Sequence, residues 1–418
     1  MAFPVPMSTL PTPADASPSH DQDVLEGSLA QLFATVPQGR FLLAALGLDA
    51  LVNPKDLETV AAFLSVGEVL EKLQADPQAF LAQLAAQAGQ VWNPAPDGSG
   101  PCLEANVPCA LKAPLEIAFQ TAVAAQAQAT GATVAVTVQS ENEASISNQG
   151  DRIDSLDAIP ALTMAAGYNS LLDHTFQKRW VTTEHFAPRP WPQVNARLAP
   201  YGFADPLGLY RAIGVNVFVF VADPARLAGR PVPDSWEALL SDAFIQDVVV
   251  CGSGDKASGS LMLHVQAHFG ADGVRRLGRG VKAGRHPSQV IKHLGTGKPD
   301  CPAVAVMPYF FARLASLRNP AVVVWPRDGA AAMPFFLLVK RQAKDATAAF
   351  ATHLEGPEVG RICSGAFFPS LHPDVPCPLP DEARLAWLGW DTIRSHDLGE
   401  LRRQATEAFE AGRREVRS

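Results

Sequence analysis

Phenol, imidazole, amide and hydroxyl side chains recur in this sequence directly after short apolar runs or beside prolines. Side chains in such loops are common ligand contacts, because the rigid elements on either side hold them in place. Neutral imidazoles and phenols suit a borderline metal ion or an anion held by hydrogen bonds, and they do not suit an apolar ligand. We predict one ligand site lined by Tyr168, Asn169, Ser258, His286, Ser288, Tyr309 and His372.

Part of this set has the chemistry of a metal site. Two imidazoles and a phenol, with a carboxylate such as Asp328, would make a nitrogen and oxygen site for a transition metal ion. The hypothetical metal ligands are His286, Tyr309 and His372. His264 and His268 also have metal-compatible spacing, but position 265 is Val and the glutamate of an HExxH motif is missing. We expect these two to be ordinary helix histidines, and we expect no cofactor beyond a bound metal ion.

Simpler explanations exist for several of these residues. Asn169 is well placed to cap a helix that begins at Ser170. The Gly/Ser-rich stretch around Ser258 is also typical of a turn followed by a helix cap. Pro287 suits the first turn of a helix, so His286 would then be a capping residue on the surface. These alternatives stay open at the level of sequence.

Signatures of catalysis are missing. The sequence has no nucleophile elbow, no HExxH motif and no dinucleotide fingerprint, and its Gly/Ser-rich stretch lacks the P-loop spacing. No CxxC pair occurs, and we expect all cysteines to be free thiols or small buried side chains. The cysteines are Cys102, Cys109, Cys251, Cys301, Cys363 and Cys377. Binding is therefore favoured over catalysis.

Hydrophobic periodicity changes along the chain. Residues 1–22 are expected to be a disordered tail, 23–95 show helical spacing, and 96–110 have the Pro- and Gly-rich composition of a linker. From 111 to 418, helical segments alternate with short apolar runs, which predicts α/β layers with buried strands. The predicted strands are 134–138, 159–164, 215–221, 248–250, 303–306, 322–325 and 335–339.

Composition limits the partners and the location. The chain has 418 residues and a net charge of −8, which argues against a nucleic-acid binder, since such proteins need a basic face. Residues 1–21 contain no Lys or Arg and no apolar core of a secretion signal, and no run of about 18 apolar residues follows. We therefore expect a cytoplasmic protein without membrane insertion, and a periplasmic location is the alternative.

The segment VPQGRFLLAALGLDALVNPKDLETVAAFLSVGEVLEKL resembles the small helical family DUF1858. Pro37, Gly47, Asn53, Pro54 and the helix that starts at Ser65 carry this resemblance. It implies a compact helical domain over residues 23–95. It implies no catalytic residue.

Three further segments are RPVPDSWEALLSDAF (230–244), PAVAVMPYFFARL (302–314) and the return segment after Val322. They resemble solute-binding proteins of ABC transporters, in particular the iron(III)-type branch. The resemblance implies an α/β fold of the type II periplasmic-binding-protein class, preceded by a small all-α domain. The implied lobes are 111–215 with 335–418, and 223–325. Ferric relatives use two adjacent tyrosines, whereas here Phe310 follows Tyr309, which removes the usual tyrosinate pair.

The resemblance implies a protein that captures a small ligand, a metal ion or a small anion, in the cleft between two lobes. Its partner would be an ABC permease, or a cytoplasmic protein that docks on the helical domain. The missing secretion signal favours a cytoplasmic sensor or delivery role. An enzyme built on the same two-lobed fold is the alternative.

Overall fold

The computed structural model divides into two compact units, Met1–Gly98 and Ser99–Ser418, which are considered separately. Among the described residues, no helix combines the length and the apolar character needed to cross a membrane. The described residues are 24–26, 29, 32, 43, 46, 48, 65–88, 100–140, 145–253, 256–292, 294–295, 301–318 and 320–417.

The first unit contains helices α6 (Val66–Lys72) and α7 (Pro77–Ala88). Ser65 caps α6 through a reciprocal capping box with Glu68, which satisfies amides that the first turn would otherwise leave unpaired. Apolar side chains of both helices pack with earlier residues of the unit. Of the positions that suggested DUF1858, Pro37, Gly47, Asn53 and Pro54 lie outside the described residues, as does the expected tail.

The second unit is built on a sheet whose strands follow the order β2-β1-β3-β10-β4-β8-β5-β6, with β11 on β10, β7 on β5 and β9 on β4. These strands are β1 (Cys102–Asn106), β2 (Ala135–Gln139), β3 (Leu162–Ala166), β4 (Arg211–Ala222), β5 (Val248–Ser253), β6 (Lys256–Ala257), β7 (Val281–Arg285), β8 (Val304–Pro308), β9 (Val322–Val324), β10 (Ala330–Val339) and β11 (Leu385–Ala386).

Two long strands, β4 and β10, connect two lobes. The first part of β4, up to Phe218, pairs with β10, and the part from Phe218 to Ala222 pairs with β8 and β9. One lobe therefore carries β1, β2 and β3, the other carries β5, β7 and β8, and β4 belongs to both. This two-lobed α/β arrangement confirms the predicted fold class.

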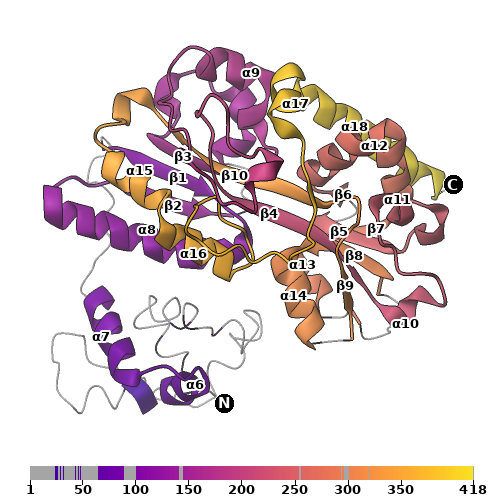
Figure 1. Ribbon diagram of the computed structural model, residues 1–418, viewed down its shortest axis with the longest axis horizontal. Helices are drawn as coiled ribbons and strands as arrows, with labels where there is room; N and C mark the ends of the chain where they lie inside the picture. The colour runs from indigo at the N-terminus through magenta and orange to yellow at the C-terminus, as the bar shows by residue number, and fades with distance from the viewer. Residues whose placement is uncertain are drawn as a thin grey trace, which may run out of the picture. The chain divides into compact units, whose positions relative to one another are not determined.

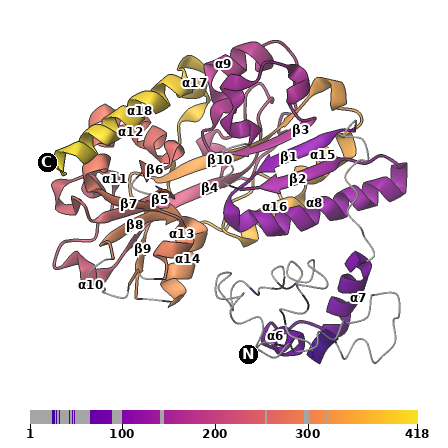
Figure 2. The same ribbon diagram turned by 180° about the vertical axis from the view of Figure 1, so that it is seen from behind.

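Helices cover both faces of each lobe. Figures 1 and 2 show α8 and α9 on opposite sides of the lobe 1 strands, and α18 alongside α12 in lobe 2. Pro224, Pro287 and Pro357 each stand at the first turn of a helix, where the missing amide hydrogen costs nothing. The helices are α8 (Cys109–Thr130), α9 (His174–Phe176), α10 (Pro224–Leu227), α11 (Trp236–Leu239), α12 (Gly259–Gly280), α13 (Pro287–Val290), α14 (Tyr309–Arg318), α15 (Ala348–Leu354), α16 (Pro357–Gly365), α17 (Gly389–Ser395) and α18 (Leu398–Glu415).

The expected linker at 96–110 is wrong over much of its length. Its residues 102–106 form β1, which lies between β2 and β3, and α8 begins at Cys109. Strand β1 has only two buried apolar residues, Leu103 and Ala105, and Val107 follows it. The Pro and Cys residues around it give the segment the composition of a linker, so the strand is not recognisable from the sequence. The strand pairs with parallel partners on both edges, and its side chains Leu103 and Ala105 are buried.

The expected lobe boundary is also wrong near the C-terminus. Residues 335–418 were assigned to lobe 1, but α18 packs along α12 of lobe 2. The packing is close because two glycines face backbone: a Cβ on Gly412 would lie 1.9 Å from the carbonyl oxygen of Arg275, and one on Gly278 would lie 2.2 Å from that of Phe409. Helix α18 therefore belongs with the second lobe.

Candidate functional site

The carboxyl ends of the strands in the two lobes point at each other. Ala166, the last residue of β3, pairs with Phe335, which in turn pairs with Gly214 of β4. Pro308, the last residue of β8, pairs with Phe218 of the same strand. Since β3 runs along β4 and β8 runs against it, both lobes end at the level of residues 214–218. Ligands of open α/β folds bind outside such strand ends.

Helix N-termini surround this junction. Helix α8 follows β1, α12 follows β5 and β6, α13 follows β7, and α14 begins directly after β8. The first-turn amides of a helix have no partner inside the helix, and they carry about half a positive charge together. The junction is therefore rich in backbone hydrogen-bond donors.

A polar side chain stands in the middle of the shared strand. Asn216 pairs with Met333 at the level where the strand ends meet, and every other residue from Ala212 to Ala222 is buried and apolar or Gly. Its Oδ1 atom is buried, and it accepts no hydrogen bond within the described part of the chain. An unsatisfied buried amide oxygen costs about 1–3 kcal/mol, so a ligand that donates to it would recover that energy. We did not predict this residue, although a lone Asn within an apolar strand is a signal.

Tyr168 is buried and serves the structure through its phenol. Its hydroxyl donates to the carbonyl oxygen of Ala332 at 2.9 Å and accepts from the amide of Leu388 at 3.0 Å. Burial raises the pKa of this phenol, so it stays protonated. Its backbone amide donates to Ser260 Oγ of α12 at 3.0 Å, and this bond joins the two lobes.

Asn169 and Ser258 cap helices, which was the simpler explanation for both. The Asn169 Oδ1 atom accepts from the Leu171 amide at 3.0 Å, and its Nδ2 donates to the carbonyl oxygen of Gly167. Ser258 Oγ accepts from the Leu261 amide at the start of α12. Both residues lie where the lobes meet, but their polar atoms are used locally.

His286 and Ser288 form the cap of α13. The Nδ1 atom of His286 accepts from the Ser288 amide at 3.2 Å and lies 2.7 Å from Ser288 Oγ. The imidazole ring packs edge-on against Phe311, with ring centroids 5.8 Å apart. The carboxyl ends of β7 and β8 are thereby brought together.

Tyr309 lies at the start of α14, mostly buried among aromatic rings. Its ring contacts Trp325 at 5.3 Å and Phe367 at 5.5 Å between centroids. Burial raises the pKa of its phenol, and nearby Arg313 offsets this only in part. Phe367 belongs to lobe 1, so this contact also crosses between the lobes.

His372 lies elsewhere. It lines a cavity in lobe 1, where its ring packs edge-on against Trp191 at 6.1 Å. Its Nδ1 atom accepts from the Asp374 amide. The described residues contain no group of three or more His, Cys, Asp or Glu side chains that could hold a metal ion. Asp328, the suggested carboxylate, accepts the Trp236 amide at the start of α11.

The lobes are also tied together by a residue that we did not predict. Arg402 of α18 holds both carboxylate oxygens of Asp173 at 3.0 Å and donates to the carbonyl oxygen of Tyr168 at 3.1 Å. Helix α18 packs on lobe 2, whereas Asp173 and Tyr168 belong to lobe 1. Nothing in the sequence pairs these distant positions.

Comparison with known proteins agrees with this geometry. A family model described as "Bacterial extracellular solute-binding protein" matches residues 157–396, which is more than half of the chain. No curated protein matches the chain. The family match does not reach the first unit, so the resemblance to DUF1858 stays a prediction.

Solved structures share the fold at low identity. The substrate-binding protein of an ABC transporter from Agrobacterium tumefaciens is 15% identical, with 77% of this chain and 97% of that chain covered and a TM-score of 0.53. A Trichodesmium protein in complex with iron and citrate is 12% identical, with 75% and 98% covered and a TM-score of 0.52. A periplasmic binding protein from Actinobacillus pleuropneumoniae with fructose-6-phosphate bound is 11% identical, with 75% and 98% covered and a TM-score of 0.50.

Proposed function

The chain belongs to the family of bacterial extracellular solute-binding proteins, and from that premise we propose that it captures a small hydroxylated anion between its two lobes. The family and its fold make it a binding protein of the ABC-transporter type rather than an enzyme. The choice of an anion depends on the residues at the junction.

Helix N-termini support an anionic ligand. Helices α8, α12 and α14 begin within a few residues of a strand end, and α14 begins with no intervening residue at all. Their first-turn amides and dipoles favour negative charge, as at many phosphate sites. A carboxylate or phosphate oxygen at the junction would accept several such hydrogen bonds at once.

Asn216 carries the second part of the proposal. Its amide offers an acceptor and two donors, and its buried Oδ1 has no partner within the described residues. A ligand hydroxyl would donate to this oxygen. A hydroxylated anion therefore satisfies both Asn216 and the helix N-termini, which an anion without a hydroxyl group does not.

A metal ion bound by His286, Tyr309 and His372 has less support. The Nδ1 atoms of both imidazoles accept backbone amides, the phenol of Tyr309 is buried among aromatic rings, and His372 lines a separate cavity. One solved structure is in complex with iron and citrate, and another has fructose-6-phosphate bound. Citrate and fructose-6-phosphate both carry anionic groups and hydroxyls.

The family description as extracellular favours the periplasmic alternative over the cytoplasmic location expected from the sequence. We propose that the loaded protein delivers its ligand to an ABC permease. A cytoplasmic sensor whose helical unit docks on a partner is the competing proposal. Fractionation of the host would separate the two, since recovery in the cytoplasmic fraction alone would contradict delivery.

Calorimetric titration of the full chain tests the ligand class. We expect fructose 6-phosphate or citrate to bind, inorganic phosphate to bind more weakly, and a neutral sugar not to bind. Asn216→Asp places a negative charge at the centre of the junction and should weaken binding of the anion by about tenfold or more, because like charges repel strongly where water is excluded.

Asn195→Asp is the matched control, because Asn195 is a buried amide in lobe 1 whose Nδ2 donates to the carbonyl oxygen of Val375, away from the strand ends. If it folds, it should leave the affinity unchanged. Binding of Fe³⁺ alone with no response to anions, or unchanged affinity in Asn216→Asp, would refute the proposal.

A further inference from the structure

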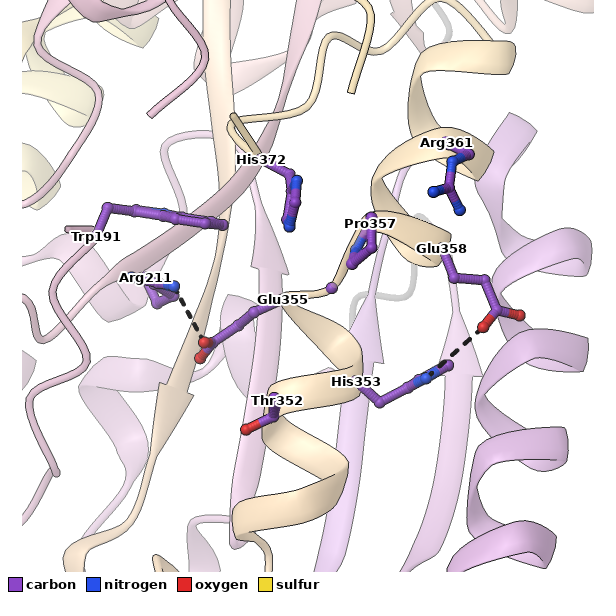
Figure 3. Close-up of a pocket in the computed structure, with 10 residues that line it drawn as sticks. Trp191, Arg211, Thr352, His353, Glu355, Pro357, Glu358, Arg361 and His372 are labelled. Carbon is purple, nitrogen blue, oxygen red and sulfur yellow. Dashed lines mark ion pairs between the residues drawn. The ribbon is translucent and has the colours of Figure 1, made fainter. Parts of the chain in front are cut away.

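A cavity of 530 Å³ opens within lobe 1, and all the residues that line it belong to that lobe. It lies between Trp191, the start of β4 at Arg211, the end of α15 and the start of α16 (Figure 3). The strand ends that form the interlobe junction lie farther along β4, at residues 214–218. Small-molecule sites typically occupy concave spaces of about 300–1,000 Å³, so this cavity has the size of one.

The Arg211 side of the cavity borders a group of charged side chains with net positive charge. Glu355 is buried and pairs with two arginines, Arg189 and Arg211, and the distance from its Oε2 to the Arg211 Nη2 is 3.1 Å. One carboxylate between two guanidinium groups leaves one positive charge unbalanced. Burial lowers the pKa of Arg211 to about 10, so it remains charged at neutral pH.

Arg211 also has an unused donor. It is 8% exposed, and its guanidinium stacks on the Trp191 ring at 3.4 Å from the ring centroid. Its buried Nε has no acceptor among the residues that the structure describes. A buried charged donor without a partner is costly, and a ligand oxygen would satisfy it.

The rim of the cavity adds further donors. Helix α16 begins at Pro357, and its N-cap residue Gly356 has no side chain with which to cap the first turn. Arg361, one turn later, is exposed and forms no ion pair within the described part of the chain. The ring of His372 lies between Trp191 and Pro357 in Figure 3. Together the rim combines a helix N-terminus, a guanidinium and an imidazole beside an aromatic wall.

We propose that this cavity is a second binding site, for a small planar carboxylate, separate from the ligand between the lobes. The carboxylate group lies between the Arg211 guanidinium, the start of α16 and Arg361, and the planar body lies against Trp191. Glu358 opposes this charge from the edge of the cavity, where its Oε2 lies 3.9 Å from the His353 Nδ1. The two residues of α16 therefore act on an anion with opposite signs.

Titration of the full chain with benzoate at low ionic strength tests the proposal. Arg361→Gln removes a charged donor and should weaken benzoate binding by about tenfold, a typical effect for one charge-assisted hydrogen bond. Glu358→Gln removes a like charge and should strengthen binding by about threefold. Both side chains are exposed, so neither change should disturb folding.

Arg414→Gln makes the same change of charge on α18 and should leave benzoate affinity as it is. Absence of benzoate binding in the parent chain would overturn the proposal. So would unchanged affinity in Arg361→Gln, because benzoate held between the lobes would not respond to that residue. Changes of the same sign in the Arg361 and Glu358 variants would also overturn it.

Discussion

The two lobes touch on both faces of the shared strand, and the two contacts have different chemistry. On the face of Phe218 and Phe220, a hydrophobic cluster contains residues of both lobes, and two polar contacts accompany it: the Tyr168 amide donates to Ser260 Oγ, and Arg402 pairs with Asp173. On the face of Val217 and Val219, the contact is aromatic. There Tyr309 and Phe310 of α14 meet two phenylalanines that follow α16, Phe367 and Phe368.

The difference bears on how the lobes can separate. Polar groups exchange their partners for water when they separate, so the net cost of separating the two polar contacts is modest and depends on salt. Aromatic side chains gain no comparable hydrogen bonds to water, and their exposure costs about 25 cal/mol for each Å² of apolar surface. We therefore expect the aromatic contact to contribute more to the stability of the protein than the two polar contacts.

The largest expected effect comes from breaking the aromatic side. Phe368→Ala removes a ring that is 2% exposed and packs with the lobe 1 core as well as with Phe310. We expect a loss of about 3–5 kcal/mol in the free energy of unfolding, the usual cost of emptying such a site. Urea denaturation measures it, and a loss below about 1 kcal/mol would show that the ring is dispensable.

Breaking the polar side should cost less. Arg402→Ala leaves the buried Asp173 carboxylate without its cation and should lower stability by about 2–3 kcal/mol. Arg403→Ala, one residue later on the exposed face of α18, is the matched control and should change little. Equal losses in the two variants would mean that Arg402 is no more than a surface ion pair.

The sequence predicted the layers of the fold better than the site. The two crossings and most strands were found because Val215–Val221 and Phe335–Val339 are apolar runs that only a buried strand explains. Strand β7 was missed, since Lys282 and Arg285 are exposed and interrupt its pattern. Helix starts were located correctly at Ser258 and His286, but whether a capping residue also faces a ligand depends on tertiary contacts that no local pattern carries.

The sequence could not predict which residues, distant along the chain, contact one another in the fold. The Asp173–Arg402 pair spans more than half of the second unit. The contact of Tyr309 with Phe367 joins the start of α14 to the turn after α16, and the order of these segments along the chain does not indicate their distance. Residues of this kind are visible only after the strands are paired. Asn216 is the exception, because a single amide side chain within an apolar strand can be recognised from the sequence alone.

A smaller effect is expected from the Tyr168 hydroxyl. Tyr168→Phe keeps the ring but removes the acceptor for the Leu388 amide and the donor to the Ala332 carbonyl. We expect a loss of about 1–2 kcal/mol in stability, because one buried backbone amide is left unsatisfied. Ligand affinity should stay unchanged, since the phenol points into the structure. A large loss of affinity at unchanged stability would instead place this phenol at the ligand, as the sequence first suggested.

The smallest effect concerns pH, and it acts through α12, which carries the polar contact. His264 lies one turn after Ser260, buried beside Trp236 and His268, and both of its ring nitrogens lack partners among the described residues. Burial, with a smaller contribution from His268, holds the pKa of His264 well below its usual value, and the charge of Asp328 acts on His268.

A base with a lowered folded pKa takes up its proton only in the unfolded state, so its contribution to stability is lost as pH falls below the unfolded pKa. That pKa is about 6.5, and a fall from pH 7 to 5.5 should therefore cost about 1 kcal/mol. His264→Leu should flatten the dependence of unfolding free energy on pH over this range, whereas His396→Leu, at an exposed position, should not. An unchanged slope in His264→Leu would mean that this histidine takes up its proton equally in the folded and unfolded protein, and that its ring is not shielded from water in the way its burial implies.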